Sequence, residues 1–164
     1  MSKRKLSVLV STGNLGDNII EEDSFYEGTK RHIDFFAADA GTADAGPTFL
    51  GADMPHNPIE WETHDLELLL VESRKRNVPM IVGSCSTTGT DKGVDLYASI
   101  VRQLAHKHKL KPFKMALIYS QIEKEELLDR IKWQTVEPLG AYKNLDEETI
   151  EKTDHVTASM GVEQ

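Results

Sequence analysis

The sequence has little cysteine and no long apolar run, and both absences narrow the kinds of protein it can be. A single cysteine, Cys85, excludes an intramolecular disulfide framework and suits a reducing compartment. No apolar run approaches the length of a bilayer span, and the N-terminus lacks the apolar core of a signal peptide. We therefore expect a cytoplasmic protein without a membrane partner.

Basic residues are also scarce, since 19 Lys and Arg stand against 27 Asp and Glu, for a formal net charge of -8. Nucleic-acid binding needs a clustered excess of basic side chains. The two short basic clusters, at residues 2–5 and 74–76, instead fit a solvated terminus and the end of a helix. We expect no nucleic-acid partner, and the length of 164 residues fits one domain over residues 1–164.

Short apolar runs alternate with stretches of helical periodicity along the chain. The runs predict strands at residues 6–11, 33–37, 78–82 and 113–119, with a last extended piece at 155–158. Periodicity predicts helices at 19–31, 64–76, from 91 or 93 to 109, from about 120 to 131, and from about 144 to 152. Thr63, Ser120 and Asn144 are the expected caps, the last two in capping boxes with Glu123 and Glu147.

This alternation is typical of right-handed βαβ units. The sequence therefore predicts an α/β fold: an open parallel sheet with helices on both faces, doubly wound and Rossmann-like. In such sheets the loops after the strands open at one edge, where ligands bind.

The loop after the second expected strand organises the chain. Its turn-forming residues are Gly41, Gly46, Pro47, Gly51, Pro55 and Pro58, so we expect neither helix nor strand between residue 39 and about residue 62. A loop of this length is typical of a binding loop or lid, although an ordinary surface excursion has the same composition. Asp39 and Asp44 are the candidate catalytic acid–base residues, and Asp is equally a common turn former.

Two other polar loops follow expected strands. The first contains a Gly-x-x-Gly turn, which can point backbone N–H groups at an anion but lacks the remainder of a nucleotide-binding motif. The later loop, residues 83–93, combines glycines with hydroxyl side chains, which suits a carboxylate or phosphate ligand and is also the composition of a flexible turn. The candidate ligand-binding residues from the three loops are Gly13, Asn14, Gly16, Asp17, Gly41, Thr42, Gly46, Gly83, Ser84, Thr87 and Gly89.

Nucleophile and metal motifs are incomplete. Ser84 and Thr87 lack a Gly-x-Ser-x-Gly elbow, so we expect them to donate hydrogen bonds. Cys85 acts as a nucleophile if a helix N-terminus lowers its pKa, or else is a small buried apolar residue. Asp and His residues supply metal-ligand types without the spacing of a known metal motif, so no metal site is assigned.

Four groups of residues along the chain form a distinctive combination. They are Gly13, Gly16 and Asp17; residues 38–42 with Asp44, Gly46, Pro47, Leu50 and Gly51; residues 65–70; and Gly83, Ser84, Thr87 and Gly89. In this combination the chain resembles the acyclic terpene utilisation (AtuA-like) family over nearly its whole length. It departs from the family pattern at Ala43 and Ala45 in the central loop, and at Cys85 and Ser86 in the later one.

The resemblance implies a catabolic protein of branched or terpenoid carboxylic acid breakdown, with CoA present as part of a thioester substrate. We expect a lyase or hydratase acting on a small carboxylate or acyl-CoA. The alternative is a non-catalytic ligand-binding or assembly subunit, and a homo-oligomer is left open. Because family members are longer, we expect the chain to be the N-terminal part of a longer protein with its sheet truncated. We therefore expect residues 1–164 alone to be marginally stable or to self-associate.

Overall fold

The central element is a three-stranded parallel sheet in the order β1–β2–β3. A computed structural model describes residues 5–42 and 46–158. The strands are β1 (Val8–Val10), β2 (Phe35–Asp39) and β3 (Met80–Gly83), paired in register with Leu9 opposite Phe36 and Ala37 opposite Ile81. The α/β class and the first three expected strands are confirmed.

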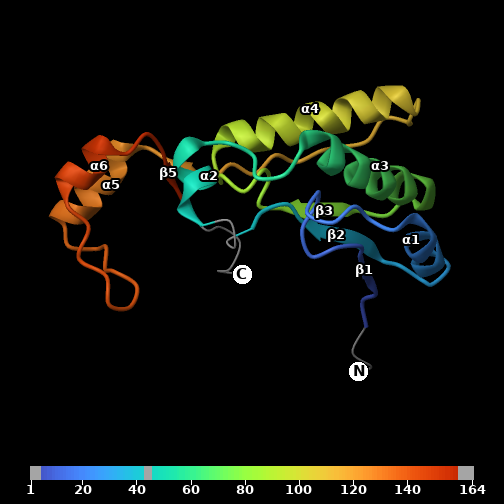
Figure 1. The fold of residues 1–164 in the computed structure, drawn as a ribbon, viewed down its shortest axis with the longest axis horizontal. Coiled ribbons are helices and arrows are strands. Elements are labelled where there is room, and N and C mark those ends of the chain that lie inside the picture. Colours follow the sequence, from blue (N-terminus) through green and yellow to red (C-terminus); the bar gives the residue numbers. More distant parts are fainter. Residues whose placement is uncertain (1–4, 43–45, 159–164) are drawn as a thin grey trace.

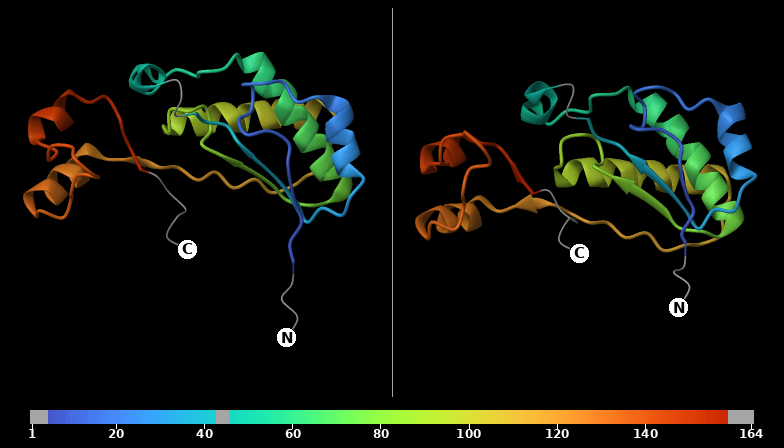
Figure 2. Two further views of the ribbon diagram at one scale, coloured as in Figure 1. Left: turned by 60° about the horizontal axis from the view of Figure 1, so that its bottom comes forward. Right: turned by 90° about the horizontal axis from the view of Figure 1, so that it is seen from below.

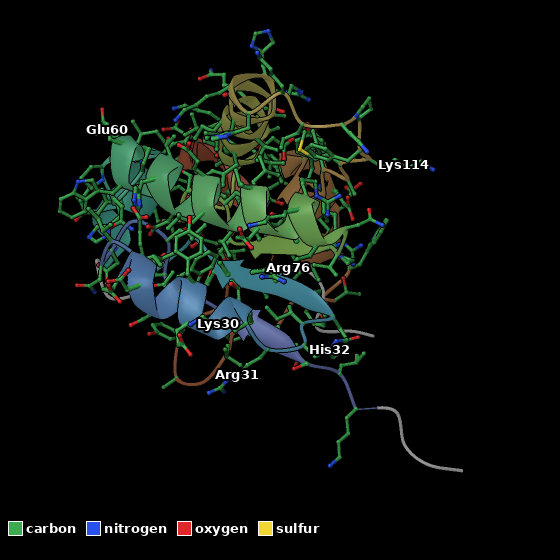
Figure 3. All side chains as sticks on the ribbon, turned by 90° about the vertical axis from the view of Figure 1, so that its right-hand side faces the viewer. Lys30, Arg31, His32, Glu60, Arg76 and Lys114 are labelled. Carbon is green, nitrogen blue, oxygen red and sulfur yellow. The ribbon has the colours of Figure 1, made fainter. Side chains whose placement is uncertain are left out.

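Three helices cover one face of this sheet: α1 (Glu22–Thr29), α3 (Ile59–Arg76) and α4 (Asp91–Lys107) (Figure 1). Figure 3 views the molecule from one end and shows all three on the same side of the strands. For α1 and α3 the strand order explains this arrangement, because successive right-handed crossovers that move in one direction place their helices on the same face. Phe36 of β2 is fully buried beneath them, with Leu66 and Leu69 of α3.

The opposite face of the sheet carries apolar side chains that remain exposed. Val8, Val10 and Ile81 are 42%, 61% and 55% exposed, because strand residues alternate between the two faces and these point away from the helices. Parallel sheets are normally covered on both sides. Within the described part of the chain, the helices cover one side only.

The C-terminal part forms a separate unit of structure beside the sheet. β4 (Gln121–Ile122) and β5 (Val156–Thr157) pair antiparallel, and α5 (Lys124–Lys132) packs against α6 (Glu147–Lys152). The strand expected at 113–119 is wrong: this segment runs extended past the sheet but pairs with no described strand (Figure 2). The extended piece expected at 155–158 is confirmed as β5.

The central loop contains a helix that the sequence did not predict. α2 spans Pro47–Ala52, and the expectation of an irregular segment there is wrong. Proline at the first position of a helix loses no intrahelical hydrogen bond and has the helical φ already, so Pro47 starts α2 instead of preventing it.

Pro58 likewise occupies the N-cap of α3, which starts at Ile59 and not beyond Thr63. The other expected caps are also displaced: Glu123 caps α5, Asp146 caps α6, and the Ser120 hydroxyl donates to the carbonyl of Gly89.

Candidate functional site

The three polar loops meet at the carboxyl edge of the sheet. The amide of Leu15 donates to the carbonyl of Asp39 at 2.8 Å, which joins the first loop to the second. The amide of Ala40 donates to the carbonyl of Gly83 at 2.9 Å, which joins the second to the third. A Cβ on Gly41 would lie 2.6 Å from that of Ser84, so only glycine allows this approach.

The predicted site residues differ in how tightly they pack at this junction. Gly16 and Gly41 are packed into it, whereas no atom of the described residues lies within 4 Å of the Cβ positions of Gly13, Gly46 and Gly83. Asp17 is exposed, and Thr42 is half-buried. Asp44 lies outside the described residues. Gly89 packs against Thr157 of β5, at one side of the junction.

Asp39 stands at the end of β2 with its carboxylate exposed. Its Oδ1 accepts the amide of Gly41 at 3.1 Å, which is the turn-forming role that Asp commonly has. The same carboxylate remains open to solvent at the junction of the loops. Its position therefore allows it both to stabilise the turn and to contact a ligand.

The loop after β3 is held in an unusual backbone conformation. Ser84, Ser86 and Thr87 have φ of 52°, 65° and 67°, a left-handed region that is costly for residues with a Cβ. The amide of Thr87 donates to the carbonyl of Ser84 at 3.1 Å, and that of Thr88 to Ser86 at 2.7 Å. The Thr90 hydroxyl then donates to Asp53 Oδ1 at 2.7 Å, which attaches the loop to the end of α2. Internal hydrogen bonds hold this loop together.

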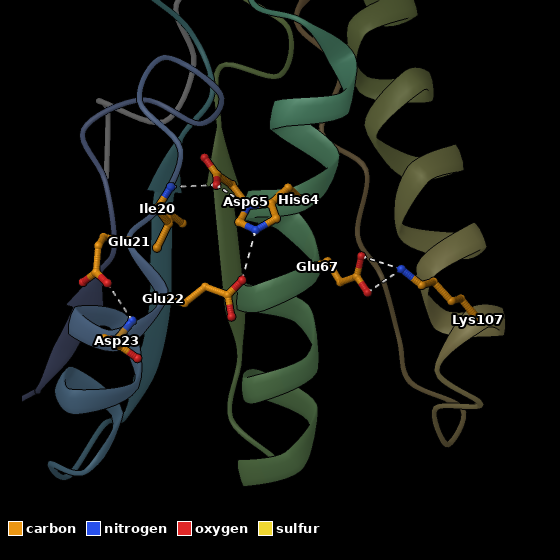
Figure 4. Close-up of polar contacts among 8 residues, drawn as sticks. All are labelled: Ile20, Glu21, Glu22, Asp23, His64, Asp65, Glu67 and Lys107. Carbon is orange, nitrogen blue, oxygen red and sulfur yellow. Dashed lines mark hydrogen bonds and ion pairs between the residues drawn. The ribbon is translucent and has the colours of Figure 1, made fainter.

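Asp65 of α3 fixes the first loop. Its side chain is fully buried, and its two oxygens accept the amides of Gly16 and Ile20, each at 3.0 Å. Figure 4 shows the bond from Ile20. His64 Nδ1 lies 3.1 Å from Asp65 Oδ1, and this hydrogen bond raises the pKa of the imidazole. Because every strong partner of Asp65 belongs to the scaffold, its role is to hold the loop in place.

Glu62, one turn earlier on α3, is a buried acid without such partners. It is 1% exposed, and a Cβ on Gly16 would lie 2.6 Å from its Cγ, so the first loop packs directly on it. Its Oε2 has no hydrogen-bond partner among the described residues. Burial away from water raises the pKa of this carboxyl to about 7, and the neighbouring Tyr97 hydroxyl lowers it only in part.

Tyr97 of α4 and Cys85 of the third loop complete the buried cluster. Burial and the nearby Glu62 carboxyl raise the pKa of Tyr97, although no hydrogen bond of ordinary geometry joins the two side chains. Burial first, then the charges of Glu62 and Asp39, raise the pKa of the Cys85 thiol to about 11. A thiol that stays protonated at neutral pH is a poor nucleophile, which favours the second interpretation of Cys85.

Asn14 adds a further unsatisfied group, since both polar atoms of its half-buried side chain are shielded from water and lack partners among the described residues. Buried polar atoms without partners are uncommon in native proteins. Asn14, Glu62 and Tyr97 carry such atoms near the loop junction, and a polar ligand bound there would satisfy them.

The sequence contains a pattern that indicates a buried position for Glu62. On a helix that starts at Ile59, position 62 shares a face with Leu66 and Leu69, so an acid stands on the apolar stripe. We expected that helix to start beyond Thr63, which left Glu62 in the preceding loop.

Within the described ranges, no group of three or more His, Cys, Asp and Glu side chains is placed to hold a metal ion. No helix of these ranges is long and apolar enough to cross a membrane. Comparisons of the chain with protein-family models, with curated proteins and with solved structures found no match.

Proposed function

We propose that the protein is a cytoplasmic enzyme of carboxylic acid or acyl-CoA breakdown, of the lyase or hydratase type, as its resemblance to the acyclic terpene utilisation family implies. The observation that supports proton-transfer chemistry is the Glu62 carboxyl, buried beside Tyr97 with its Oε2 unpartnered among the described residues. A carboxyl with a pKa of about 7 is half-protonated at neutral pH, so it can both accept and donate a proton.

Lyase and hydratase reactions need a base at one carbon and an acid at the leaving group. Glu62 is the proposed proton carrier, and the Tyr97 hydroxyl beside it is a donor for an oxygen of the substrate. Asp39 is the proposed second carboxyl, and Asp44, which lies outside the described residues, is proposed as a further acid–base residue. Residues 83–89 are the proposed binding segment for the substrate carboxylate or thioester.

Proton exchange provides the test. The wild-type chain in D₂O should incorporate deuterium at the α-carbon of butyryl-CoA or butyrate, followed by NMR. Glu62→Gln should lower the exchange rate by about 10²-fold or more, because an amide cannot carry the proton. Glu60→Gln is the matched control, since Glu60 lies exposed on the same helix. Equal rates for Glu62→Gln and the control would remove Glu62 from the chemistry.

One observation favours the alternative, a non-catalytic ligand-binding or assembly subunit. The open face of the sheet, with Val8, Val10 and Ile81, is a surface that a partner chain or a second copy could cover. The same surface supports the proposal of a doubly wound fold, in which a further layer covers this face. Calorimetric titration with free CoA and butyryl-CoA separates the two functions, because binding without exchange or turnover supports the subunit.

A further inference from the structure

A cavity of about 610 Å³ lies along β3, between α3, α4 and the extended segment 113–118. Its walls are mainly aliphatic and aromatic, with side chains such as Leu66, Leu70, Val101, Phe113 and Met115. Cavities that bind small molecules are typically about 300–1,000 Å³ and largely apolar. The size and lining of this cavity therefore suit an apolar ligand.

The cavity is elongated, and its two ends differ chemically. It follows residues 78–82, from just before β3 into the strand, a length of about 13 Å at the usual rise of extended backbone. At the carboxyl end of the strand it reaches Tyr97 and Cys85, so it opens toward the buried cluster of the loop junction. At the other end it is lined by Arg74.

Arg74 has only neutral partners in the described part of the chain. Its guanidinium donates to the carbonyl of Val78 and lies 5.3 Å from the ring centroid of Phe113, and its Nε donates to the Ser73 hydroxyl at 3.5 Å. No carboxylate of the described residues lies within ion-pair distance of it. Lys114 also lines the cavity, and its side chain extends away from the helices (Figure 3). A half-buried cation in an apolar wall, without a carboxylate partner, is suited to an anionic ligand.

We propose that this cavity binds an amphipathic monocarboxylate of medium chain length, with its apolar chain along β3 and its carboxylate on Arg74. A chain of this length fills an elongated apolar space, and the guanidinium offers a carboxylate two parallel donors. The distal end of the chain then lies near Tyr97. This site goes beyond the proton transfer proposed for Glu62 and does not depend on it.

Titration of the full chain with decanoate, followed by calorimetry, tests the site. We expect one decanoate per chain, with affinity rising about fourfold for each methylene group from hexanoate to decanoate. Arg74→Gln should weaken decanoate binding by about tenfold or more through loss of the charged hydrogen bonds. Arg102→Gln is the matched control, because Arg102 is exposed on α4 and does not line the cavity.

Two further measurements keep the proposal open to refutation. Ala98→Phe places a ring in the cavity and should abolish binding if circular dichroism shows the variant folded; if it does not fold, the Arg74→Gln result decides. No binding of decanoate, or equal binding by both Arg variants, overturns the site. Equal affinity for decanol and decanoate also overturns it, because it would show that Arg74 does not recognise the carboxylate.

The proposed function can fail separately from this site. Glu62 does not line the cavity, so Glu62→Gln should leave decanoate affinity unchanged whether or not it lowers the exchange rate.

Discussion

Replacing Glu62 by Gln should change how the stability of the protein depends on pH. The pKa of this carboxyl rises from an ordinary 4.5 to about 7 on folding, because burial disfavours the charged form. The folded state therefore binds the proton more tightly than the unfolded state. The contribution of the neutral carboxyl is fully present below about pH 4.5 and is lost as the pH rises through about 7.

The magnitude follows from the shift. One pKa unit corresponds to 1.36 kcal/mol, so a rise from 4.5 to about 7 means that ionised Glu62 destabilises the folded state by about 3 kcal/mol above pH 8. Gln cannot ionise and escapes this effect. The free energy of unfolding of Glu62→Gln, relative to wild type, should therefore increase by about 3 kcal/mol between pH 4 and pH 8.

Urea unfolding at intervals from pH 4 to pH 8, followed by circular dichroism, measures this difference. The subtraction removes contributions from other titrating groups, which both proteins share. A difference that stays constant with pH would refute the reasoning, because it would show that Glu62 ionises as freely when folded as when unfolded.

Glu67→Gln, on the same helix, is the control with the opposite sign. Burial opposes ionisation of Glu67, but bonds to Lys107, at 2.6 Å, and to His108 outweigh it and lower the pKa (Figure 4). A lowered pKa gives stability that is present above pH 4.5 and lost as the pH falls. Glu67→Gln should therefore be less stable than wild type at neutral pH, with a difference that shrinks in acid.

Three other outcomes are expected. Asp65→Ala should lower the free energy of unfolding, measured in urea, by about 2–5 kcal/mol, because the amides of Gly16 and Ile20 lose their buried acceptor. A loss under about 1 kcal/mol would mean that water replaces the carboxylate. Gly16→Ala should lower the free energy of unfolding by about 2 kcal/mol or more, because the φ of Gly16 is 77° and the added Cβ meets the Glu62 side chain. An unchanged urea midpoint would contradict this crowding. Light scattering should show that the chain self-associates through the open sheet face, and the double variant Val10→Thr, Ile81→Thr should self-associate less. Equal association of the double variant and the wild type would exclude that face.

The sequence predicted the helix-covered sheet well, because buried parallel strands and amphipathic helices leave strong periodic patterns. The prediction of a strand at residues 113–119 was wrong, because the alternating pattern indicates that one side of the segment is buried and does not indicate pairing with another strand. Phe113, Met115 and Leu117 alternate with exposed neighbours and line the cavity, so the period of two is present without a hydrogen-bonded partner strand. An apolar alternation shows which side of a segment faces the core, but pairing depends on where another strand lies.

The convergence of the three loops was predictable, because it follows from parallel strand order alone. The buried acid was not predicted, because its position depends on where α3 begins. Proline is compatible with the first turn of a helix, so Pro58 allowed a start at Ile59 where we expected a break. That shift of a few residues moved Glu62 from an expected loop to the buried face of a helix.

Two buried acids, one turn apart on α3, differ in their hydrogen-bond partners. Asp65 accepts two backbone amides, so the cost of burying its charge is offset within the fold. Among the described residues, Glu62 has no such donors at Oε2, and its ionisation costs about 3 kcal/mol of the roughly 5–15 kcal/mol that typically stabilises a domain. A leucine there would continue the apolar stripe of Leu66 and Leu69 without that cost. Because packing alone would favour the leucine, the carboxyl at the loop junction supports the proton-carrier role proposed for Glu62.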